Sequence, residues 1–141
     1  MPYYVHQSDS CCVSQSVSSS TYPLILVVED DDDNLLLIRY VLESFGYRFV
    51  GQKDSRKALA TVKEYQPDLI LMDVLLPDVD GIQLVKHLKQ DEITEQIPVI
   101  AVTALAKTED RESLLLAGFA DYISKPYMLE DLEAAIRRHL R

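Results

Sequence analysis

Alternation between short apolar runs and longer segments of helical period predicts an α/β fold for this chain, with a doubly wound parallel sheet covered by helices on both faces. The run Leu69-Ile70-Leu71-Met72 is typical of these apolar runs, because a strand buried on both faces is apolar at every position rather than at alternate ones. Five such runs alternate with helical segments, which is the pattern of repeated strand–helix units. Since right-handed crossovers favour a doubly wound arrangement and no sixth strand is found, we expect a five-stranded parallel sheet in the order 2-1-3-4-5.

The predicted elements follow one another from Pro23 to the end of the chain. The strands are expected at residues 24–28, 47–51, 69–72, 99–102 and 121–123. The helices are expected at about residues 32–45, 55–65, 81–90, 107–117 and 129–139. Gly46 and Gly118 each follow a predicted helix at the position where a left-handed C-cap is needed, which supports those two boundaries.

Residues 1–22 differ in composition from the rest of the chain. They are rich in Ser, have no sustained period and contain too little apolar surface to offset the entropy of ordering, so we expect a disordered extension. Within it, the adjacent Cys11 and Cys12 are expected to be free thiols, because neighbouring cysteines suit neither a disulfide framework nor a spaced metal site. Residues 23–141 form the one predicted domain, and no output domain is expected after it.

Length and charge exclude several classes of protein. At 141 residues, of which 48% are hydrophobic, the chain suits a single domain with an adequate core. A formal net charge of -9 argues against direct binding of nucleic acid or docking on anionic lipid, since both need Lys and Arg facing phosphates. No apolar stretch is long enough to span a bilayer, and the first residues lack the features of a signal peptide. We therefore expect a cytoplasmic protein without membrane insertion.

Five polar side chains are predicted at the carboxyl ends of the strands. Glu29 and Asp30 follow the first strand, Asp73 the third and Thr103 the fourth, and Lys125 lies just past the fifth. In the order 2-1-3-4-5 these ends surround one crevice, where open α/β sheets bind their ligands. The set holds a carboxylate nucleophile, further carboxylates for a divalent cation, a hydroxyl donor and a fixed cation, which together suit phosphoryl transfer.

Each of these side chains has an expected role in such a transfer. Asp73 would attack the phosphoryl group. Asp30 would bind Mg²⁺ directly and Glu29 through a water, because Mg²⁺ dehydrates reluctantly. Lys125 would pair with one phosphoryl oxygen, and Thr103 would donate a hydrogen bond to another.

Four short motifs, taken in order, resemble the receiver domain of two-component response regulators, of the single-domain CheY-like type. They are Val27-Val28-Glu29-Asp30, Leu71-Met72-Asp73 with Pro77 and Gly81 in their usual places, Val102-Thr103-Ala104, and Tyr122-Ile123-Ser124-Lys125-Pro126. The resemblance implies that Asp73 accepts a phosphoryl group from a sensor histidine kinase or a histidine phosphotransfer protein, with Mg²⁺ as cofactor. It also implies that the backbone carbonyl of Leu75 joins Glu29, Asp30 and Asp73 as a metal ligand.

The same resemblance implies a switch and two partner surfaces. Thr103 would turn toward the phosphoryl group while Tyr122 turns inward, and the bond between Lys125 and Pro126 would be cis. The surface of the fourth helix, fifth strand and fifth helix would dock a downstream protein target or a second copy in a homodimer, unless the phosphoryl group passes onward in a phosphorelay. A donor's helical bundle would lie near four residues of the first helix, Asn34, Leu35, Ile38 and Val41. Helical spacing assigns some of these four residues to the core instead.

Other proteins use parts of this arrangement. A phosphatase of the haloacid-dehalogenase type needs an acid two residues after its aspartate nucleophile, where this chain has Leu75. A flavodoxin-like cofactor protein needs small residues and open amides after the first strand, where this chain has Glu29 followed by four aspartates. The alternative that the sequence leaves open is a receiver-fold binding module that does not respond to phosphorylation. Under either interpretation we expect a signalling protein rather than an enzyme, with at most self-phosphorylation from small phosphodonors and autodephosphorylation.

Overall fold

A parallel sheet forms the centre of the molecule. The computed structural model describes residues 4–6, 11–14, 22–74, 81–103 and 108–140. Across the sheet lie, in order, β4 (Arg48–Gln52), β3 (Leu24–Val28), β5 (Leu69–Asp73), β6 (Val99–Thr103) and β7 (Asp121–Ser124). Numbered along the chain from β3, this is the order 2-1-3-4-5, and each strand agrees with its predicted bounds to within one residue. The predicted fold class is therefore confirmed.

The sheet continues beyond β4 through a segment in which the sequence predicted no strands. β1 (Tyr4–His6) and β2 (Cys11–Ser14) pair antiparallel with each other, and β2 also pairs antiparallel with β4. Without β2, β4 would be an edge strand with a row of unpaired backbone N–H and C=O groups, which β2 instead pairs. The expectation of disorder in residues 1–22 does not hold for these two strands. Backbone hydrogen bonds form the ladders of these two strands, so the Ser-rich composition of the segment did not predict them.

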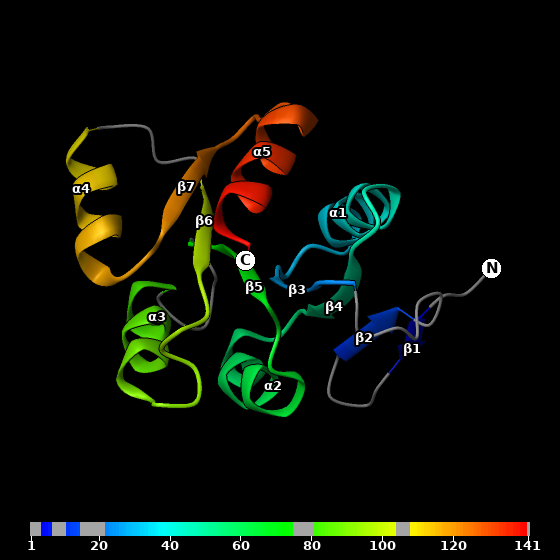
Figure 1. Ribbon diagram of the computed structural model, residues 1–141, viewed down its shortest axis with the longest axis horizontal. Helices are drawn as coiled ribbons and strands as arrows, with labels where there is room; N and C mark the ends of the chain where they lie inside the picture. Colours follow the sequence, from blue (N-terminus) through cyan, green and yellow to red (C-terminus); the bar gives the residue numbers. More distant parts are fainter. Residues whose placement is uncertain (1–3, 7–10, 15–21, 75–80, 104–107, 141) are drawn as a thin grey trace.

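Helices cover both faces of the sheet (Figure 1). α1 (Asp32–Ser44) and α5 (Leu129–His139) lie on one face, and α2 (Ala58–Tyr65), α3 (Gly81–Gln90) and α4 (Thr108–Ala117) lie on the other. A short 3-10 helix, η1 (Ser55–Lys57), precedes α2, so the helix predicted at 55–65 begins as a tighter turn. Among the described residues, no helix combines the length and the apolar character needed to cross a membrane.

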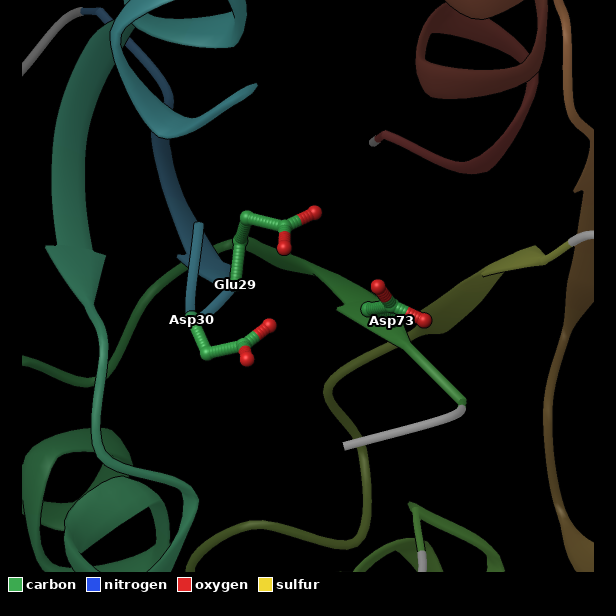
Figure 2. A group of neighbouring side chains, drawn as sticks. All are labelled: Glu29, Asp30 and Asp73. Carbon is green, nitrogen blue, oxygen red and sulfur yellow. The ribbon is translucent and has the colours of Figure 1, made fainter. Parts of the chain in front are cut away.

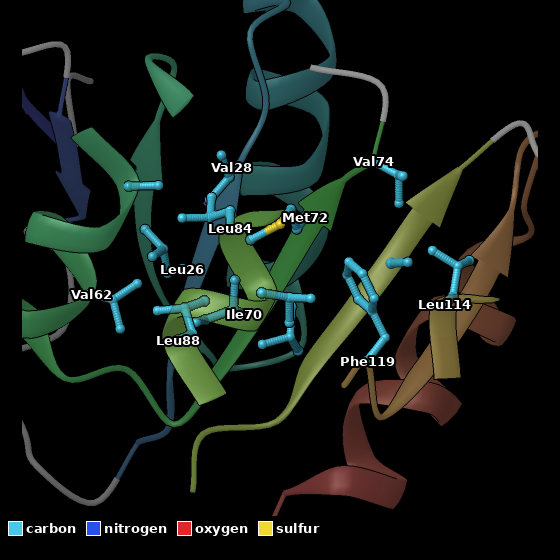
Figure 3. Close-up of a cluster of buried hydrophobic side chains, with 14 of the residues drawn as sticks. Leu26, Val28, Val62, Ile70, Met72, Val74, Leu84, Leu88, Leu114 and Phe119 are labelled. Carbon is cyan, nitrogen blue, oxygen red and sulfur yellow. The ribbon is translucent and has the colours of Figure 1, made fainter. Parts of the chain in front are cut away.

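Apolar side chains of the strands point alternately to the two faces and build a separate core on each. Ile25 and Val27 of β3 pack toward α1 and α5, whereas Leu26 and Val28 pack toward α2, α3 and α4. Figure 3 shows the second core, in which the strands meet the helix residues Val62, Leu84, Leu88 and Leu114. Because both faces are packed, the strand ends are fixed relative to one another, and so are the residues that follow them.

Cap residues set the ends of several helices. Oδ2 of Asp31 accepts a hydrogen bond of 2.8 Å from the backbone N–H of Asn34 and so caps α1. Gly46 and Gly118 have φ angles of +89° and +119°, so both glycines predicted as C-caps adopt the left-handed backbone. These boundaries were therefore predictable from residue type.

Candidate functional site

Three carboxylates meet at the carboxyl edge of the sheet (Figure 2). Glu29 and Asp30 directly follow β3, and Asp73 is the last residue of the neighbouring strand β5. The parallel ladder between these strands pairs Val28 with Met72, so the residues after that pair lie side by side. Each of the three side chains offers one oxygen, and these oxygens lie within 4.8 Å of one another. Glu29 is buried, Asp73 is half-buried and Asp30 is exposed, so the cluster opens to solvent on the side of Asp30.

Lys125 supplies a positive charge beside the cluster. Its Nζ lies 3.2 Å from Oδ2 of Asp73 and 3.8 Å from Oε1 of Glu29. The bond between Lys125 and Pro126 is cis, the isomer that the resemblance implied, and the backbone N–H of Lys125 donates to the carbonyl of Thr103 at 2.8 Å. In the described part of the site, one ammonium group lies beside two of the three clustered carboxylates, which leaves an excess of negative charge.

Burial and like charge act together on the carboxyl group of Glu29. Its pKa is raised from 4.5 to about 7, first because the side chain is buried and further by the negative charge of Asp73. The backbone N–H of Asp31, which donates to Oε2 of Glu29 at 3.2 Å, and the ammonium group of Lys125 act in the opposite direction. Relief of the remaining repulsion needs a proton or a cation at this position.

The cluster has the ligand chemistry that Mg²⁺ prefers. Carboxylate oxygens from three residues are hard ligands, and the side open to solvent leaves room for the waters that Mg²⁺ keeps. A divalent cation would also neutralise the excess negative charge. Glu29, Asp30 and Asp73 therefore fit the predicted metal site. The fourth predicted ligand, the carbonyl of Leu75, lies outside the described residues.

Thr103 and Tyr122 lie on the two strands beyond Asp73. Thr103 is the last residue of β6 and is fully buried; the ladder pairs Asp73 with Val102, so Thr103 lies one residue further along. Tyr122 of β7 pairs with Ala101 and packs, partly buried, against the core beneath α2, α3 and α4. Thr103 thus reaches the edge that carries the carboxylates, and Tyr122 lies two ladder positions before that edge.

The outer surface of α1 differs from the surface predicted to face a donor. Asn34 is exposed, but Leu35, Ile38 and Val41 are buried in the core beneath α1 and α5. The exposed apolar residues of α1 are Leu36, Leu37 and Tyr40. Residues 35–38 are apolar at four consecutive positions, so helical spacing alone did not decide which side faces the sheet.

A groove that the sequence did not predict borders the carboxylates. It has a volume of about 450 Å³, and Glu29 and Lys125 form part of its lining. The rest of the lining comes from α1, from the segment that joins β7 to α5 and from the first residue of α5; these residues are Asn34, Leu37, Ile38, Pro126, Tyr127 and Leu129. The sequence signal was the apolar character of both segments, but only the fold brings them together.

Comparison with known proteins identifies the family. A model described as the response regulator receiver domain matches residues 25–137. The chain is 42% identical over 105 residues to the phosphate regulon transcriptional regulatory protein PhoB of Escherichia coli, which covers 74% of this chain and 46% of PhoB. It is 41% identical over 104 residues to the polar-differentiation response regulator DivK of Brucella ovis, which covers 74% of this chain and 85% of DivK. The chain therefore spans about half the length of PhoB and most of DivK.

Solved structures agree with this assignment. The receiver domain of sensor histidine kinase PA1611 from Pseudomonas aeruginosa, with a magnesium ion coordinated in its active-site cleft, matches with a TM-score of 0.77 and 36% identity over 84% of this chain and 97% of that chain. The chemotaxis protein CheY4 of Vibrio cholerae shares the fold, with a TM-score of 0.79 and 24% identity over 84% of this chain and 99% of that one. Since the family model extends from β3 to α5 and includes the carboxylate cluster and Lys125, the chain belongs to the response regulator receiver domain family.

Proposed function

We propose that this chain carries a phosphoryl group on Asp73, received from a sensor histidine kinase or a histidine phosphotransfer protein in a reaction that needs Mg²⁺. The observation that carries the proposal is the 3.2 Å contact between Nζ of Lys125 and Oδ2 of Asp73, beside the acidic pair Glu29 and Asp30. A carboxylate between a fixed cation and a metal-binding pair is suited to attack a phosphoryl group and to hold the product. The phosphorylated chain then docks on a downstream protein target or passes the group to another histidine, in the cytoplasm.

In the proposed transfer, an oxygen of Asp73 forms a bond to phosphorus while the bond from phosphorus to the donor's imidazole nitrogen breaks. The electron pair of that bond leaves with the nitrogen, a proton restores the neutral imidazole, and the product is an aspartyl phosphate. Lys125 pairs with one phosphoryl oxygen and the hydroxyl of Thr103 donates a hydrogen bond to another. Glu29, Asp30 and Asp73 would hold Mg²⁺, with the Leu75 carbonyl as the further predicted ligand, and the bound ion would supply positive charge that stabilises the transferred phosphoryl group.

The donor is proposed to dock on the apolar groove beside the carboxylates. This groove shares Glu29 and Lys125 with the site and is otherwise mainly apolar. Exposed Leu36 and Tyr40 extend the apolar surface along α1. Helices bind such grooves through apolar anchors spaced along one face. A helical donor fits this surface because a helix lying there brings its histidine beside Asp73.

Phosphorylation by a small phosphodonor tests the proposal. Incubation with acetyl phosphate and Mg²⁺ is expected to add a single phosphoryl group, measured by intact mass spectrometry. Asp73→Asn is expected to stay unmodified, while Asp121→Asn, which removes a carboxylate at the opposite end of the sheet, is expected to react like the wild type. An adduct of equal yield on Asp73→Asn, or none on the wild type even with an active cognate kinase, would overturn the assignment.

The alternative is a binding module that does not respond to phosphorylation. The two functions differ in whether residues distant from Asp73 change position when Asp73 is phosphorylated. We propose that Thr103 and Tyr122 change position on phosphorylation and alter the surface of α4, β7 and α5, where a downstream target or a second copy docks. Beryllofluoride with Mg²⁺ is expected to change amide hydrogen exchange around both residues, and light scattering on the same sample measures whether a homodimer forms. Unchanged exchange around both residues would favour the alternative.

A further inference from the structure

Gln52, the last residue of β4, is a polar residue with no exposed surface. Both halves of its amide are used. Nε2 donates to Oγ1 of Thr61 in α2 at 2.9 Å, and Oε1 accepts from the backbone N–H of Asp54 at 2.9 Å. The hydroxyl of Thr61 in turn donates to the carbonyl of Lys57 at 2.9 Å. Since a buried amide is costly unless its hydrogen bonds are made, this network fixes the end of β4 against α2.

The main chain of Gln52 binds the backbone of Glu29, whose buried carboxylate belongs to the proposed metal site. The ladder between β3 and β4 ends with Val28 opposite Gln52, and the backbone N–H of the next residue, Glu29, donates to the carbonyl of Gln52 at 3.1 Å. An ion pair between Lys53 and Asp32 joins the same two segments, but it is largely exposed and therefore weaker. The side chain of Glu29 is buried, so it has little freedom to compensate for a shift of its backbone.

We propose that Gln52 is a positioning residue that sets the Mg²⁺ affinity of the site without contacting the metal. The inference rests on the proposed function and assigns a role to a residue outside the carboxylate cluster. The amide of Gln52 fixes the end of β4, the end of β4 fixes the backbone of Glu29, and Glu29 places one oxygen in the cluster. Residues that orient metal ligands commonly change metal affinity when they are replaced.

A buried hydrogen bond far from the site provides a matched control. Thr94 is also buried, and its hydroxyl donates to the carbonyl of Leu88 near the end of α3. Replacing Thr94 by Val removes a buried hydrogen bond with little change of shape, as does replacing Thr61 by Val. Both changes are expected to lower stability, but only the one at Thr61 touches the partner of Gln52.

The test compares Mg²⁺ affinity with thermal stability in the full chain. The Kd for Mg²⁺ is measured by isothermal titration calorimetry and Tm by circular dichroism, for the wild type, Gln52→Met, Thr61→Val and Thr94→Val. Gln52→Met keeps the length of the side chain without its hydrogen bonds and is expected to weaken Mg²⁺ binding about threefold to tenfold. Thr61→Val is expected to weaken binding in the same direction by less, whereas Thr94→Val lowers Tm and leaves the Kd unchanged.

The outcomes separate this inference from the function on which it rests. A wild type that binds no Mg²⁺ overturns both. A wild type that binds Mg²⁺, with an unchanged Kd in Gln52→Met and a lowered Tm, overturns the positioning role alone and leaves Gln52 as a structural amide. Should Gln52→Met fail to fold, the milder Thr61→Val decides, because an unchanged Kd in that variant also overturns the role.

Discussion

Two groups of charged side chains lie at opposite ends of the sheet and differ in charge balance. At the carboxyl edge, three carboxylates form a cluster, and one ammonium group lies beside two of them. At the start of β7, Oδ2 of Asp121 lies 3.0 Å from a guanidinium nitrogen of Arg138 and 3.0 Å from Nε2 of His139. Burial acts to raise the pKa of Asp121, but the backbone N–H of Tyr122, His139 and Arg138 together hold it below its ordinary value. The pKa of Glu29, by contrast, is raised to about 7.

This difference distinguishes an ion-pair group that stabilises the fold from a carboxylate cluster that is suited to bind a cation. The group around Asp121 is complete within the chain, because α5 supplies both partners and is thereby tied to β7. The carboxylate cluster is complete only with a proton or a cation, since its one described cation does not balance its charge. Only the carboxylate cluster should therefore respond to Mg²⁺, and the two groups should respond in opposite ways to pH and differently to replacement of a carboxylate by an amide.

Removal of the exposed carboxylate from the cluster should have the largest effect. Asp30→Asn is expected to weaken Mg²⁺ binding by about tenfold to a hundredfold, because a charged oxygen ligand becomes a neutral one. In Mg²⁺-free buffer its Tm is expected not to fall, since a like charge has been removed. Calorimetry measures the first effect and circular dichroism the second.

Asp31→Asn is the matched control for that variant. The carboxylate of Asp31 caps α1 rather than joining the cluster, and Asn is an equally good N-cap residue. Its Mg²⁺ affinity is expected to stay close to that of the wild type. Equal losses of affinity in the two variants would show that the acidic loop binds Mg²⁺ by diffuse charge instead of through a defined cluster.

The dependence of Mg²⁺ binding on pH should follow the proton on Glu29. Because its pKa is raised to about 7, Mg²⁺ must displace a proton in acidic solution, so the apparent affinity rises with pH and levels off above that value. We expect about a tenfold difference between about pH 6 and about pH 8. Calorimetry in two buffers of different ionisation enthalpy measures both the affinity and the protons released.

Stability without Mg²⁺ should change with pH in the opposite sense. A carboxyl group whose pKa is raised in the folded state contributes stability that is fully present below its unfolded pKa of 4.5 and is lost as the pH rises through about 7. Glu29→Gln mimics the protonated form and is expected to flatten both profiles. Identical slopes in this variant and the wild type would assign the titration to another group.

Asp121→Asn should have the smallest effect and should act on stability alone. The Asp121 pair with Arg138 is partly exposed, so its loss is expected to cost about 0.5–1 kcal/mol near neutral pH, measured by chemical denaturation. Since the pKa of Asp121 is lowered in the folded state, this contribution is present above the unfolded pKa and is lost as the pH falls through the folded value. The Kd for Mg²⁺ should not change. A weakened Kd would mean that the two ends of the sheet are coupled.

The main features of the fold and the carboxylate cluster followed from patterns that local physics enforces. A strand buried on both faces must be apolar throughout, so the ends of the central strands were visible in the sequence to within one residue. Once the strand order was inferred, Glu29, Asp30 and Asp73 had to meet, because neighbouring parallel strands end at the same edge. The assignment of the Leu75 carbonyl as a ligand stays a prediction.

The features that were missed depend on contacts between distant segments. β1 pairs with β2, and β2 pairs with β4, a strand distant in the sequence, so the local composition did not predict them. Leu36 and Leu37 are exposed, but they lie in a run of consecutive apolar residues, so the sequence did not show which side chains of that run face solvent. Gln52 lies one residue beyond the strand predicted at 47–51, and only the packing of α2 against β4 provides Thr61 as its buried partner.

The strand that pairs with β4 also changes how the sheet meets other molecules. An antiparallel neighbour needs no crossover helix, so the short stretch from Tyr4 to Ser14 adds both β1 and β2. The described sheet consequently ends in strands of three and four residues, β1 and β7. Strands this short offer few free backbone groups as templates, which protects the chain against edge-to-edge aggregation.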